Sequence, residues 1–326
     1  MRQYLAQRIA LIPVTLFVVS LLTFILAQLV PGDVGRTILG PYATNSQVHA
    51  LDQRLGYNLP VLQRYWHWAT GFVSGNWGVS PVLQVPIRPL VMSRLGNSLL
   101  LAATAFVIVV PISVTLGVVA GVREGSRTDR AISLVGLALL GLPEFVGATV
   151  LIVVFGVTLA WLPVTAQAPP GSGLLTRLHY LVLPAIPLVF VLFGYISRTA
   201  RAGTIETSNA QFLRTARLKG IPRRAVLTHH LLPNALLPTV TVIGFQVGYL
   251  IAGLTVIEEL FNYPGLGQLL ISSATDHDLP TLADITMLVA IIFLVANVLA
   301  DASYALLNPR ISEDVRDQED YGDEHG

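Results

Sequence analysis

The stretch from Leu95 to Val122 reads LGNSLLLAATAFVIVVPISVTLGVVAGV and contains no charged residue. About 20 mostly apolar residues are enough for an α-helix to cross the hydrocarbon core of a bilayer. This stretch is longer than that, so it predicts a membrane-spanning helix, and it sets the fold class for the rest of the chain.

Five further stretches repeat the pattern with at most one charged residue each, namely 9–32, 131–161, 178–197, 235–257 and 285–307. The first is too long for the apolar part of a signal peptide and lacks a cleavage site, so we expect it to stay in the membrane. Pro163 and Pro169-Pro170-Gly171 indicate that the chain leaves the membrane after a single helix over 131–161. The sequence therefore predicts an all-α integral membrane protein, a single transmembrane domain over 1–326 with six transmembrane helices.

The composition excludes several other classes of protein. Charged residues make up 12% of the 326 residues, against roughly 25% in ordinary globular chains, and the mean hydropathy is +0.66. These values exclude intrinsic disorder, and zero Cys excludes a disulfide scaffold. The single Lys, Lys219, is followed by Gly220, so the chain has no phosphate-binding loop of the Gly-Lys-Ser/Thr type. A net charge of +1 predicts no nucleic-acid partner.

The basic residues predict the orientation in the membrane. Fourteen of the 20 Lys and Arg residues fall in four segments, 1–8, 123–130, 198–234 and 308–326. Because cytoplasmic loops carry an excess of Lys and Arg, we expect these segments, and both termini, in the cytoplasm.

Two segments outside the spans have distinct compositions. The outer segment 31–94 is rich in Trp and Tyr, which predicts an extracytoplasmic insert that is folded. Within it, 51–68 is typical of an amphipathic helix. The segment could cap the outer mouth, lie at the membrane interface, where Trp and Tyr are favoured, or dock a partner. The tail 313–326 carries seven acidic residues and one basic residue, which predicts a solvated, disordered end.

The long segment 198–234 predicts two helices joined at a glycine. Ser208, with Gln211 three residues on, is typical of a capping box that starts a helix near Asn209. Gly220 can end that helix in the left-handed conformation, and Pro222 suits the start of the next. Such a pair could be a basic interfacial element that only enforces topology, or a docking element for a cytoplasmic protein.

The order Arg214-Thr215-Ala216, then Gly220, then Leu232-Pro233 resembles the cytoplasmic loop of binding-protein-dependent ABC importer permeases. The family pattern is Glu-Ala-Ala, three residues, Gly, nine residues, Ile-x-Leu-Pro. Here Arg214 replaces the Glu and His230 replaces the Ile, and both departures are usual in the peptide branch.

Four other pieces resemble the B-type permease subunit of the dipeptide/oligopeptide importers. They are Val30-Pro31-Gly32-Asp33 after the first helix, Gly75-Asn76-Trp77-Gly78-Val79-Ser80, the Glu-x-x-Phe-x-x-Pro-Gly-Leu-Gly loop over 258–267, and Asn308-Pro309-Arg310. The resemblance implies the type I ABC importer fold in a bacterial inner membrane. It also implies a second, C-type permease, two cytoplasmic ATPase domains, an extracytoplasmic binding protein and a peptide substrate.

The resemblance also implies roles for particular residues. ATP and Mg would be bound by the ATPase partners, so no cofactor and no catalytic residue is expected in this chain. The residues expected to couple to the ATPase are Arg214, Thr215, Ala216, Arg217, Lys219, Gly220, Leu232 and Pro233. The residues expected to dock the binding protein are Glu258, Phe261, Pro264 and Gly265.

Polar residues within the spans are candidates of another kind. Glu144 is ionisable and lies mid-span after Pro143. It could line the pathway or engage a peptide amino group, and it could equally be protonated or hydrogen-bonded to the neighbouring subunit. Pro143 could kink the helix. Asn297 and Asp301 share a helix face and predict a structural polar pair. Small residues at Gly117 and Gly121 predict close helix packing.

The sequence also bears on a possible metal site and on other kinds of membrane protein. We expect Asp276-His277-Asp278 to be a solvated turn rather than a metal site, because three adjacent ligands cannot easily converge on one ion. An ion-driven secondary transporter would need coupling-ion carboxylates in broken helices and often has inverted repeats, whereas the sequence has one mid-span Glu and no repeat. An intramembrane enzyme would need a motif such as His-Glu-x-x-His, which is absent, and a channel would need no large cytoplasmic coupling loop. The alternatives that stay open are an ion-gradient-driven secondary transporter of small solutes and an ABC importer for nickel or glutathione.

Overall fold

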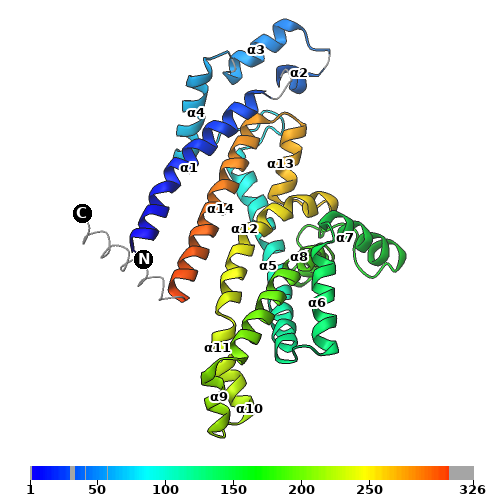
Figure 1. The fold of residues 1–326 in the computed structure, drawn as a ribbon. Helices are drawn as coiled ribbons and strands as arrows, with labels where there is room; N and C mark the ends of the chain where they lie inside the picture. Colours follow the sequence, from blue (N-terminus) through cyan, green and yellow to red (C-terminus); the bar gives the residue numbers. More distant parts are fainter. Residues whose placement is uncertain (1, 30–33, 41, 57, 308–326) are drawn as a thin grey trace, which may run out of the picture. The chain divides into compact units, whose positions relative to one another are not determined.

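The computed structural model describes residues 2–29, 34–40, 42–56 and 58–307 (Figure 1). Across these ranges the regular elements are helices, with one isolated antiparallel bridge between Val79 and Pro86. The chain divides into two compact units. The first comprises Met1–Ile9, Leu101–Gly253 and Val295–Gly326, and the second Ala10–Leu100 and Leu254–Leu294.

The predicted spans coincide with helices. They are α1 (Arg2–Leu29), α5 (Ile87–Val122), α6 (Arg127–Leu140) with α7 (Glu144–Leu151) and η1 (Ile152–Thr158), α8 (Leu174–Ser208), α12 (Leu237–Leu260) and α14 (Leu279–Leu307). Among the described residues, three helices are long and apolar enough to cross a membrane, or up to five if each of two bent pairs counts as one span. The apolar part of α1, Ala10–Leu26, falls just short of that length. The chain is thus a helical membrane protein, as the sequence predicts.

The prediction of a single helix over 131–161 is wrong. α6 ends at Leu140, α7 begins at Glu144, and the two halves are bent by 102°. Pro143 precedes α7 with φ −58° and ψ 135°, which is not helical. Because proline also disfavours helical geometry in the residue before it, the chain breaks here instead of kinking.

The first unit is built around α8. Two thirds of the apolar window of this helix is buried, against 22% for α5. A Cβ built on Gly117 would lie 2.5 Å from the carbonyl oxygen of Ser197, and one on Gly121 would lie 2.6 Å from Cβ of Thr204. The predicted close approach at these two glycines is therefore confirmed, and α8 is the partner helix.

The second unit contains the segment after the first helix, as α2 (Val34–Leu39), α3 (Asn45–Leu55) and α4 (Val61–Ser74), together with α13 (Leu266–Thr275). The single amphipathic helix predicted over 51–68 is wrong. Gly56 has φ +74° between α3 and α4, and Pro60 precedes α4 with ψ 139°. Each breaks the helical path, so two helices form.

Aromatic side chains give this segment its core. The ring of Tyr65 lies 5.5 Å from that of Phe24, Trp68 stacks on Phe24 at 5.9 Å, and Phe72 stacks on Trp77 at 4.9 Å. The Tyr65 hydroxyl hydrogen-bonds Ser20 Oγ of α1 at 2.8 Å. The segment is therefore folded, as predicted, and the contacts of its aromatic side chains contribute to its core.

Three parts of the sequence discussed above lie outside the described residues, namely 30–33, 308–310 and the acidic tail 313–326.

Candidate functional site

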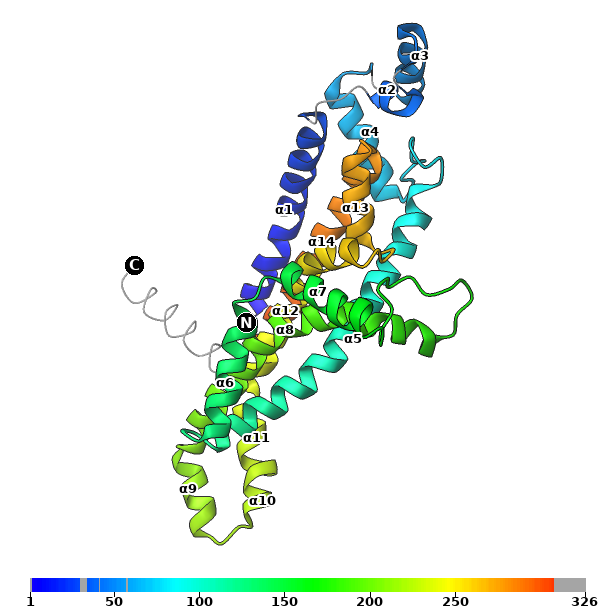
Figure 2. The same cartoon turned by 90° about the vertical axis from the view of Figure 1, so that its right-hand side faces the viewer.

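The 198–234 segment ends in a helical hairpin, hereafter the hairpin, over 211–235. Its first arm is α9 (Gln211–Leu218), and its second arm runs through α10 (Arg223–Ala225), η2 (Val226–Leu231) and α11 (Leu232–Ala235). Figure 2 shows the two arms side by side, joined by a short turn. The wide π-helical turns of η2 fall just before Pro233, whose ring would strike the carbonyl of residue 229 in a regular α-helix.

The hairpin has an apolar core of its own. Leu213 and Ala216 lie three residues apart on one face of α9 and are buried against Val226, Leu231 and Ala235. Ile221, Leu227 and Leu232 pack around this cluster. Because each arm buries its apolar stripe on the other, the hairpin is a rigid element and not a loose loop.

Gly220 closes α9 in the way the sequence predicts. Its φ is +75°, its N–H donates to the carbonyl of Arg217 at 3.0 Å, and the N–H of Ile221 donates to Ala216 at 3.3 Å. This is the two-bond glycine cap that ends many helices. The predicted capping box at Ser208 is wrong, because α8 continues to Ser208 and α9 begins after Ala210 with no side-chain cap.

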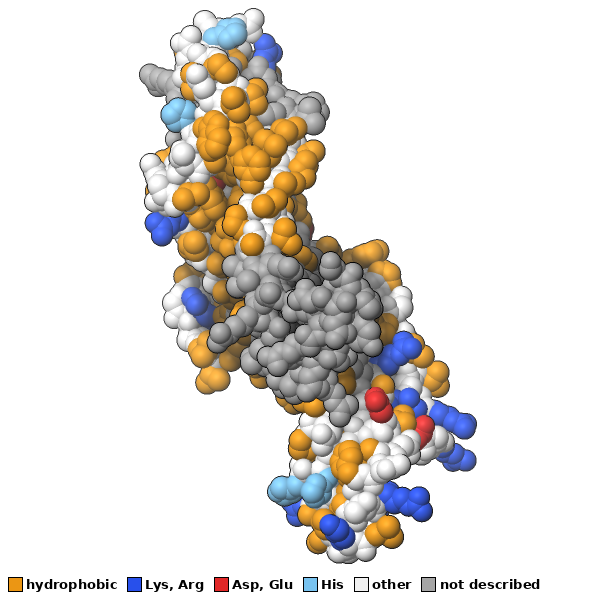
Figure 3. All heavy atoms as spheres, turned by 60° about the vertical axis from the view of Figure 1, so that its left-hand side comes forward, with side chains coloured by type: hydrophobic (Ala, Val, Ile, Leu, Met, Phe, Trp, Pro, Cys, Tyr) orange, Lys and Arg blue, Asp and Glu red, His pale blue; other side chains and the backbone are white. Residues whose placement is uncertain are grey.

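The outer surface of the hairpin combines charge with apolar groups. Its exposed basic side chains are Arg214, Arg217, Lys219, Arg223 and Arg224. Phe212 and Leu218 are also exposed, the latter at 80%. Figure 3 shows basic and apolar side chains intermixed at the lower end of the view, where the hairpin lies. Such a surface suits a partner that is both acidic and partly apolar.

The base of the hairpin is fixed to α8. A Cβ on Gly203 of α8 would lie 2.2 Å from the carbonyl oxygen of Ala235, so the two backbones touch. The hairpin is therefore in direct backbone contact with α8.

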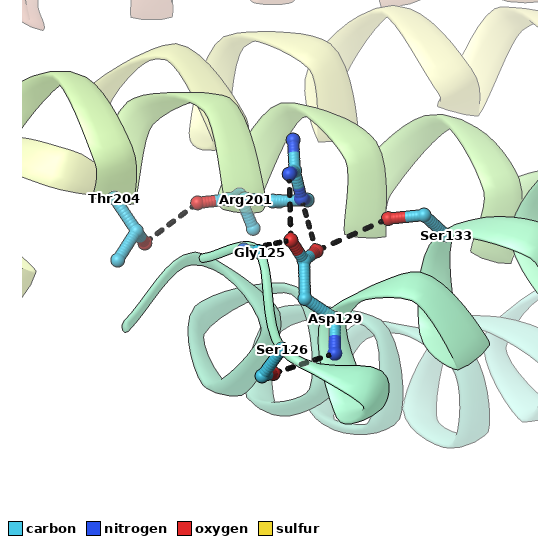
Figure 4. A network of polar contacts seen from close by, with 7 residues as sticks. Gly125, Ser126, Asp129, Ser133, Arg201 and Thr204 are labelled. Atoms are coloured by element: carbon cyan, nitrogen blue, oxygen red, sulfur yellow. Dashed lines mark hydrogen bonds and ion pairs between the residues drawn. The ribbon is translucent and has the colours of Figure 1, made fainter. Parts of the chain in front are cut away.

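An ion pair that the sequence analysis missed ties α6 to α8 (Figure 4). Arg201 donates from Nε to Asp129 Oδ1 at 2.5 Å and from Nη2 to Oδ2 at 2.8 Å. The N–H of Gly125 donates to Oδ2 at 2.9 Å, and Ser126 Oγ accepts from the N–H of Asp129 at 3.1 Å. Ser126 with Asp129 three residues on is a helix-start signal that could have identified half of this site.

A hydrogen-bond network around Glu258, in the second unit, holds the loop over 258–267 in shape, and the sequence analysis did not predict it. Glu258 is fully buried and accepts hydrogen bonds from Ser98 Oγ at 2.5 Å and from the N–H groups of Gly267 and Gln268 at 2.7 and 3.2 Å. Its carboxylate thus lies at the N-terminus of α13, where the helix dipole favours negative charge. Gly265 leaves room for it, since a Cβ there would lie 2.1 Å from Glu258 Cδ.

Comparison with known proteins decides the family. Residues 113–313 match the family described as "Binding-protein-dependent transport system inner membrane component", and residues 1–86 match its N-terminal family. The chain belongs to this family. The permease is 32% identical over 308 residues to the probable peptide ABC transporter permease protein y4tP of Sinorhizobium fredii, covering 94% of this chain and 98% of the relative. It is 34% identical over 312 residues to the glutathione transport system permease protein GsiC of Escherichia coli, covering 95% and 99%.

The family defines the class of the protein. The permease is a membrane-embedded transport subunit of an ABC importer, with the type I importer fold, and a multi-pass protein of the inner membrane. Membership of this family implies that it works with other subunits of a binding-protein-dependent transport system. The predicted resemblance is confirmed over nearly the whole chain.

The structure separates the predicted coupling residues into two groups. Arg214, Thr215, Arg217, Lys219, Gly220 and Pro233 are exposed on the hairpin. Ala216 is buried and Leu232 half-buried, both within the hairpin core. The first group can contact a partner, whereas the second shapes the element that does so, and the coupling role of both stays a prediction.

The residues expected to dock a binding protein are mostly interior. Glu258, Phe261 and Gly265 are buried and Pro264 is half-buried. The carbonyl of Pro264 accepts from Asn97 Nδ2 at 2.8 Å. These residues hold the loop in shape, while Glu259 and Asn262 are exposed on it. Docking stays a prediction for the loop, with these two side chains among its accessible polar groups.

The polar candidates of the spans lie in the first unit. Glu144 opens α7 and is half-buried, with its carboxylate beside Gly253 of α12; a Cβ on Gly253 would lie 2.9 Å from Oε2. Asn297 is half-buried in α14, and the side chain of Asp301 lies outside the described residues. The pairing of Asn297 with Asp301 stays a prediction.

The acidic residues near 276–284 form no metal site among the described residues. Asp276 is exposed, as expected for a solvated turn, but the same expectation is wrong for Asp278. Asp278 is 2% exposed and accepts a hydrogen bond from Ser80 Oγ. Asp284, further along α14, accepts from Trp68 Nε1 at 2.8 Å. These contacts tie α14 to the segment after the first helix.

Proposed function

We propose that the permease forms half of the translocation pathway of an importer of di- or oligopeptides, with a second homologous C-type permease as the other half. Two cytoplasmic ATPase domains, which bind ATP and Mg and are not part of this chain, drive the cycle. An extracytoplasmic binding protein delivers the peptide. Both termini of the permease lie in the cytoplasm, as the distribution of Lys and Arg indicates.

The hairpin is the observation that supports this proposal. It exposes five Lys or Arg side chains and the large apolar side chains of Phe212 and Leu218, it is held rigid by its own core, and its base touches α8. When the ATPase domains close on ATP, they displace the hairpin as a rigid body. Because a rigid element transmits displacement without absorbing it, α8 and the helices packed on it follow.

The transported solute is proposed from the relatives and from Glu144. One relative is named for peptides and another for glutathione, which is itself a small peptide. The half-buried Glu144 carboxylate can accept hydrogen bonds from the ammonium group of a peptide. A glutathione importer is the second candidate, favoured by the 34% identity to the permease of that system.

Purification in mild detergent from native membranes tests the assembly. A P-loop ATPase and a second multi-pass permease should be recovered with the tagged chain, and a recovered binding protein would give the solute. If the chain purifies alone and transports under an ion gradient, the proposal fails.

Gly220 tests the coupling role. In proteoliposomes with the partner subunits, Gly220→Val should abolish ATP-driven uptake, because a left-handed backbone costs an ordinary residue about 1–2 kcal/mol and a β-branched one more. Gly220→Asn should keep most of the activity, since Asn tolerates this conformation. Gly171→Val is the matched control: Gly171 has φ +80° and equally open surroundings, but it lies in a different loop. Normal uptake by Gly220→Val would refute the coupling role.

A further inference from the structure

A groove runs between α6 and α8 in the first unit. It has a volume of about 270 Å³ and is lined by five residues of α6 and four of α8. These residues are Ile132, Ser133, Gly136, Leu137, Leu140, Gly194, Ser197, Arg198 and Arg201. One end of the groove is polar and carries two arginines, and the rest is apolar.

Two glycines shape the apolar end of the groove. A Cβ on Gly194 would lie 2.3 Å from Leu140 Cγ, so the two helices touch there. A Cβ on Gly136 would meet Ser197 Oγ only at 3.5 Å, an ordinary contact, so the groove remains open beside Gly136. On the same helix, Leu134 and Leu137 are exposed at 66% and 53%, as expected of a surface in contact with acyl chains.

At the polar end, one guanidinium and one hydroxyl have no hydrogen-bond partner among the described residues. Asp129 already neutralises Arg201 through the two hydrogen bonds of their ion pair. Arg198 is exposed, and among the described residues its side chain makes no hydrogen bond or ion pair. Ser197 is 4% exposed and, within the same part of the chain, its hydroxyl has no partner either. A guanidinium and a hydroxyl that line the same groove are suited to a phosphate group, which can accept hydrogen bonds from both.

The level of this polar end in the membrane follows from the sequence. The uncharged stretch 178–197 of α8 ends at Ser197, and Arg198 is the first charged residue after it, where hydrocarbon gives way to headgroups. The first turn of α6 adds Arg127 and Arg130, both exposed, at the same end as the ion pair. This excess of positive charge favours a headgroup of net negative charge over a zwitterionic one.

We propose that the groove between α6 and α8 binds one anionic phospholipid, with its phosphate on Arg198 and Ser197 and an acyl chain along Leu137 and Leu140. The lipid supports the joint between the two helices next to the Asp129–Arg201 pair. This inference rests on the proposed placement of α8 in the membrane, but not on the identity of the transported solute.

Native mass spectrometry of the complex, purified and then equilibrated with mixed phosphatidylglycerol and phosphatidylcholine micelles, tests the proposal. The wild type should retain phosphatidylglycerol preferentially. Arg198→Ala should lower its affinity about fivefold, the value expected for one basic residue near an anionic lipid, and Arg198→Lys should recover most of it. Gly136→Leu should displace the lipid by filling the groove.

Arg177→Ala is the matched control, because Arg177 is exposed at the opposite end of α8. Unchanged phosphatidylglycerol retention in both Arg198→Ala and Gly136→Leu would overturn the proposal. Equal retention of phosphatidylcholine by the wild type, or competition by free inorganic phosphate, would overturn its lipid class. None of these readouts requires transport, so the lipid proposal can hold even if the peptide-importer proposal fails.

The orientation of α8 in the membrane is tested separately. Because the chain has no Cys, single cysteines can be introduced and labelled from either side of the membrane.

Discussion

Gly203 of α8 and Ala235 of α11 are in backbone contact, with no space for even a methyl group between them: a Cβ on Gly203 would lie 2.2 Å from the Ala235 carbonyl oxygen. The hairpin is attached to the first unit at this point. Thr204, the next residue, is fully buried, and its hydroxyl donates to the carbonyl of Ala200 at 2.7 Å, so α8 is closely packed beside the contact.

Gly203→Ala should therefore separate the hairpin from α8. We expect a loss of stability of about 1–3 kcal/mol, as for other overpacked sites, and a larger proportional loss of ATP-driven uptake than of ATP hydrolysis. Thermal unfolding in detergent and paired uptake and hydrolysis assays measure both. Gly96→Ala is the control, because Gly96 is also helical but has nothing within 4 Å of its Cβ position. Equal behaviour of the two variants would show that the contact is not rigid.

The Asp129–Arg201 pair makes a second prediction, on stability. Removing one partner of a buried pair costs about 3–5 kcal/mol. Because the Arg201 side chain is 32% exposed, we expect Arg201→Ala to cost less, about 2 kcal/mol. Asp129 is then left buried with its charge unmatched, whereas the double variant with Asp129→Ala has no such charge. The double variant should thus be more stable than the sum of the single ones predicts.

Thermal unfolding of the four proteins of this cycle measures the coupling energy. Arg130→Ala serves as the reference, since Arg130 is exposed on the same turn of α6. Strict additivity of the two single variants would mean that the pair contributes nothing beyond its separate residues.

These sites differ in how far the sequence predicts them. Gly220 is predictable, because its cap depends only on the local backbone and on an apolar contact one turn away. The Ser208 capping box fails because α8 continues through it, supported by burial against the first unit that no local pattern reveals. Asp129 and Arg201 lie 72 residues apart, and neither local sequence identifies the other. The Glu258 motif is recognisable by resemblance, but the reason for its Gly265 is visible only once the carboxylate is placed.

Glu258 makes a third prediction, which separates shaping of the loop from docking. Glu258→Gln keeps one acceptor oxygen, which can face the N–H groups of Gly267 and Gln268, but it removes the negative charge at the start of α13 and places an NH₂ group where Oε1 accepts from Ser98 Oγ. The charge-assisted hydrogen bonds of the carboxylate are therefore weakened. We expect a loss of about 1–3 kcal/mol and faster proteolysis of the 258–268 loop. Limited proteolysis followed by mass spectrometry detects the cleavage.

Glu259→Gln is the matched control, one residue along and exposed. It should leave the proteolysis rate unchanged, while it weakens association with the binding protein if this loop docks that partner. If Glu258→Gln weakened association and left proteolysis unchanged, Glu258 would be a docking residue and not the group that holds the loop.

Glu144 makes the last prediction, on the solute. If its carboxylate receives the ammonium group of a peptide, Glu144→Gln should lower uptake of peptides with a free N-terminus about tenfold, the value of one charge-assisted hydrogen bond. Uptake of N-acetylated peptides, which lack the ammonium group, should be low in the wild type and unchanged by the substitution. Gly253→Ala should act in the same direction, because its Cβ would lie 2.9 Å from Oε2 and displace the carboxylate. Uptake of the two peptide classes by reconstituted complexes measures both effects. A parallel loss for both classes would assign Glu144 to the packing of α7 on α12 rather than to the solute.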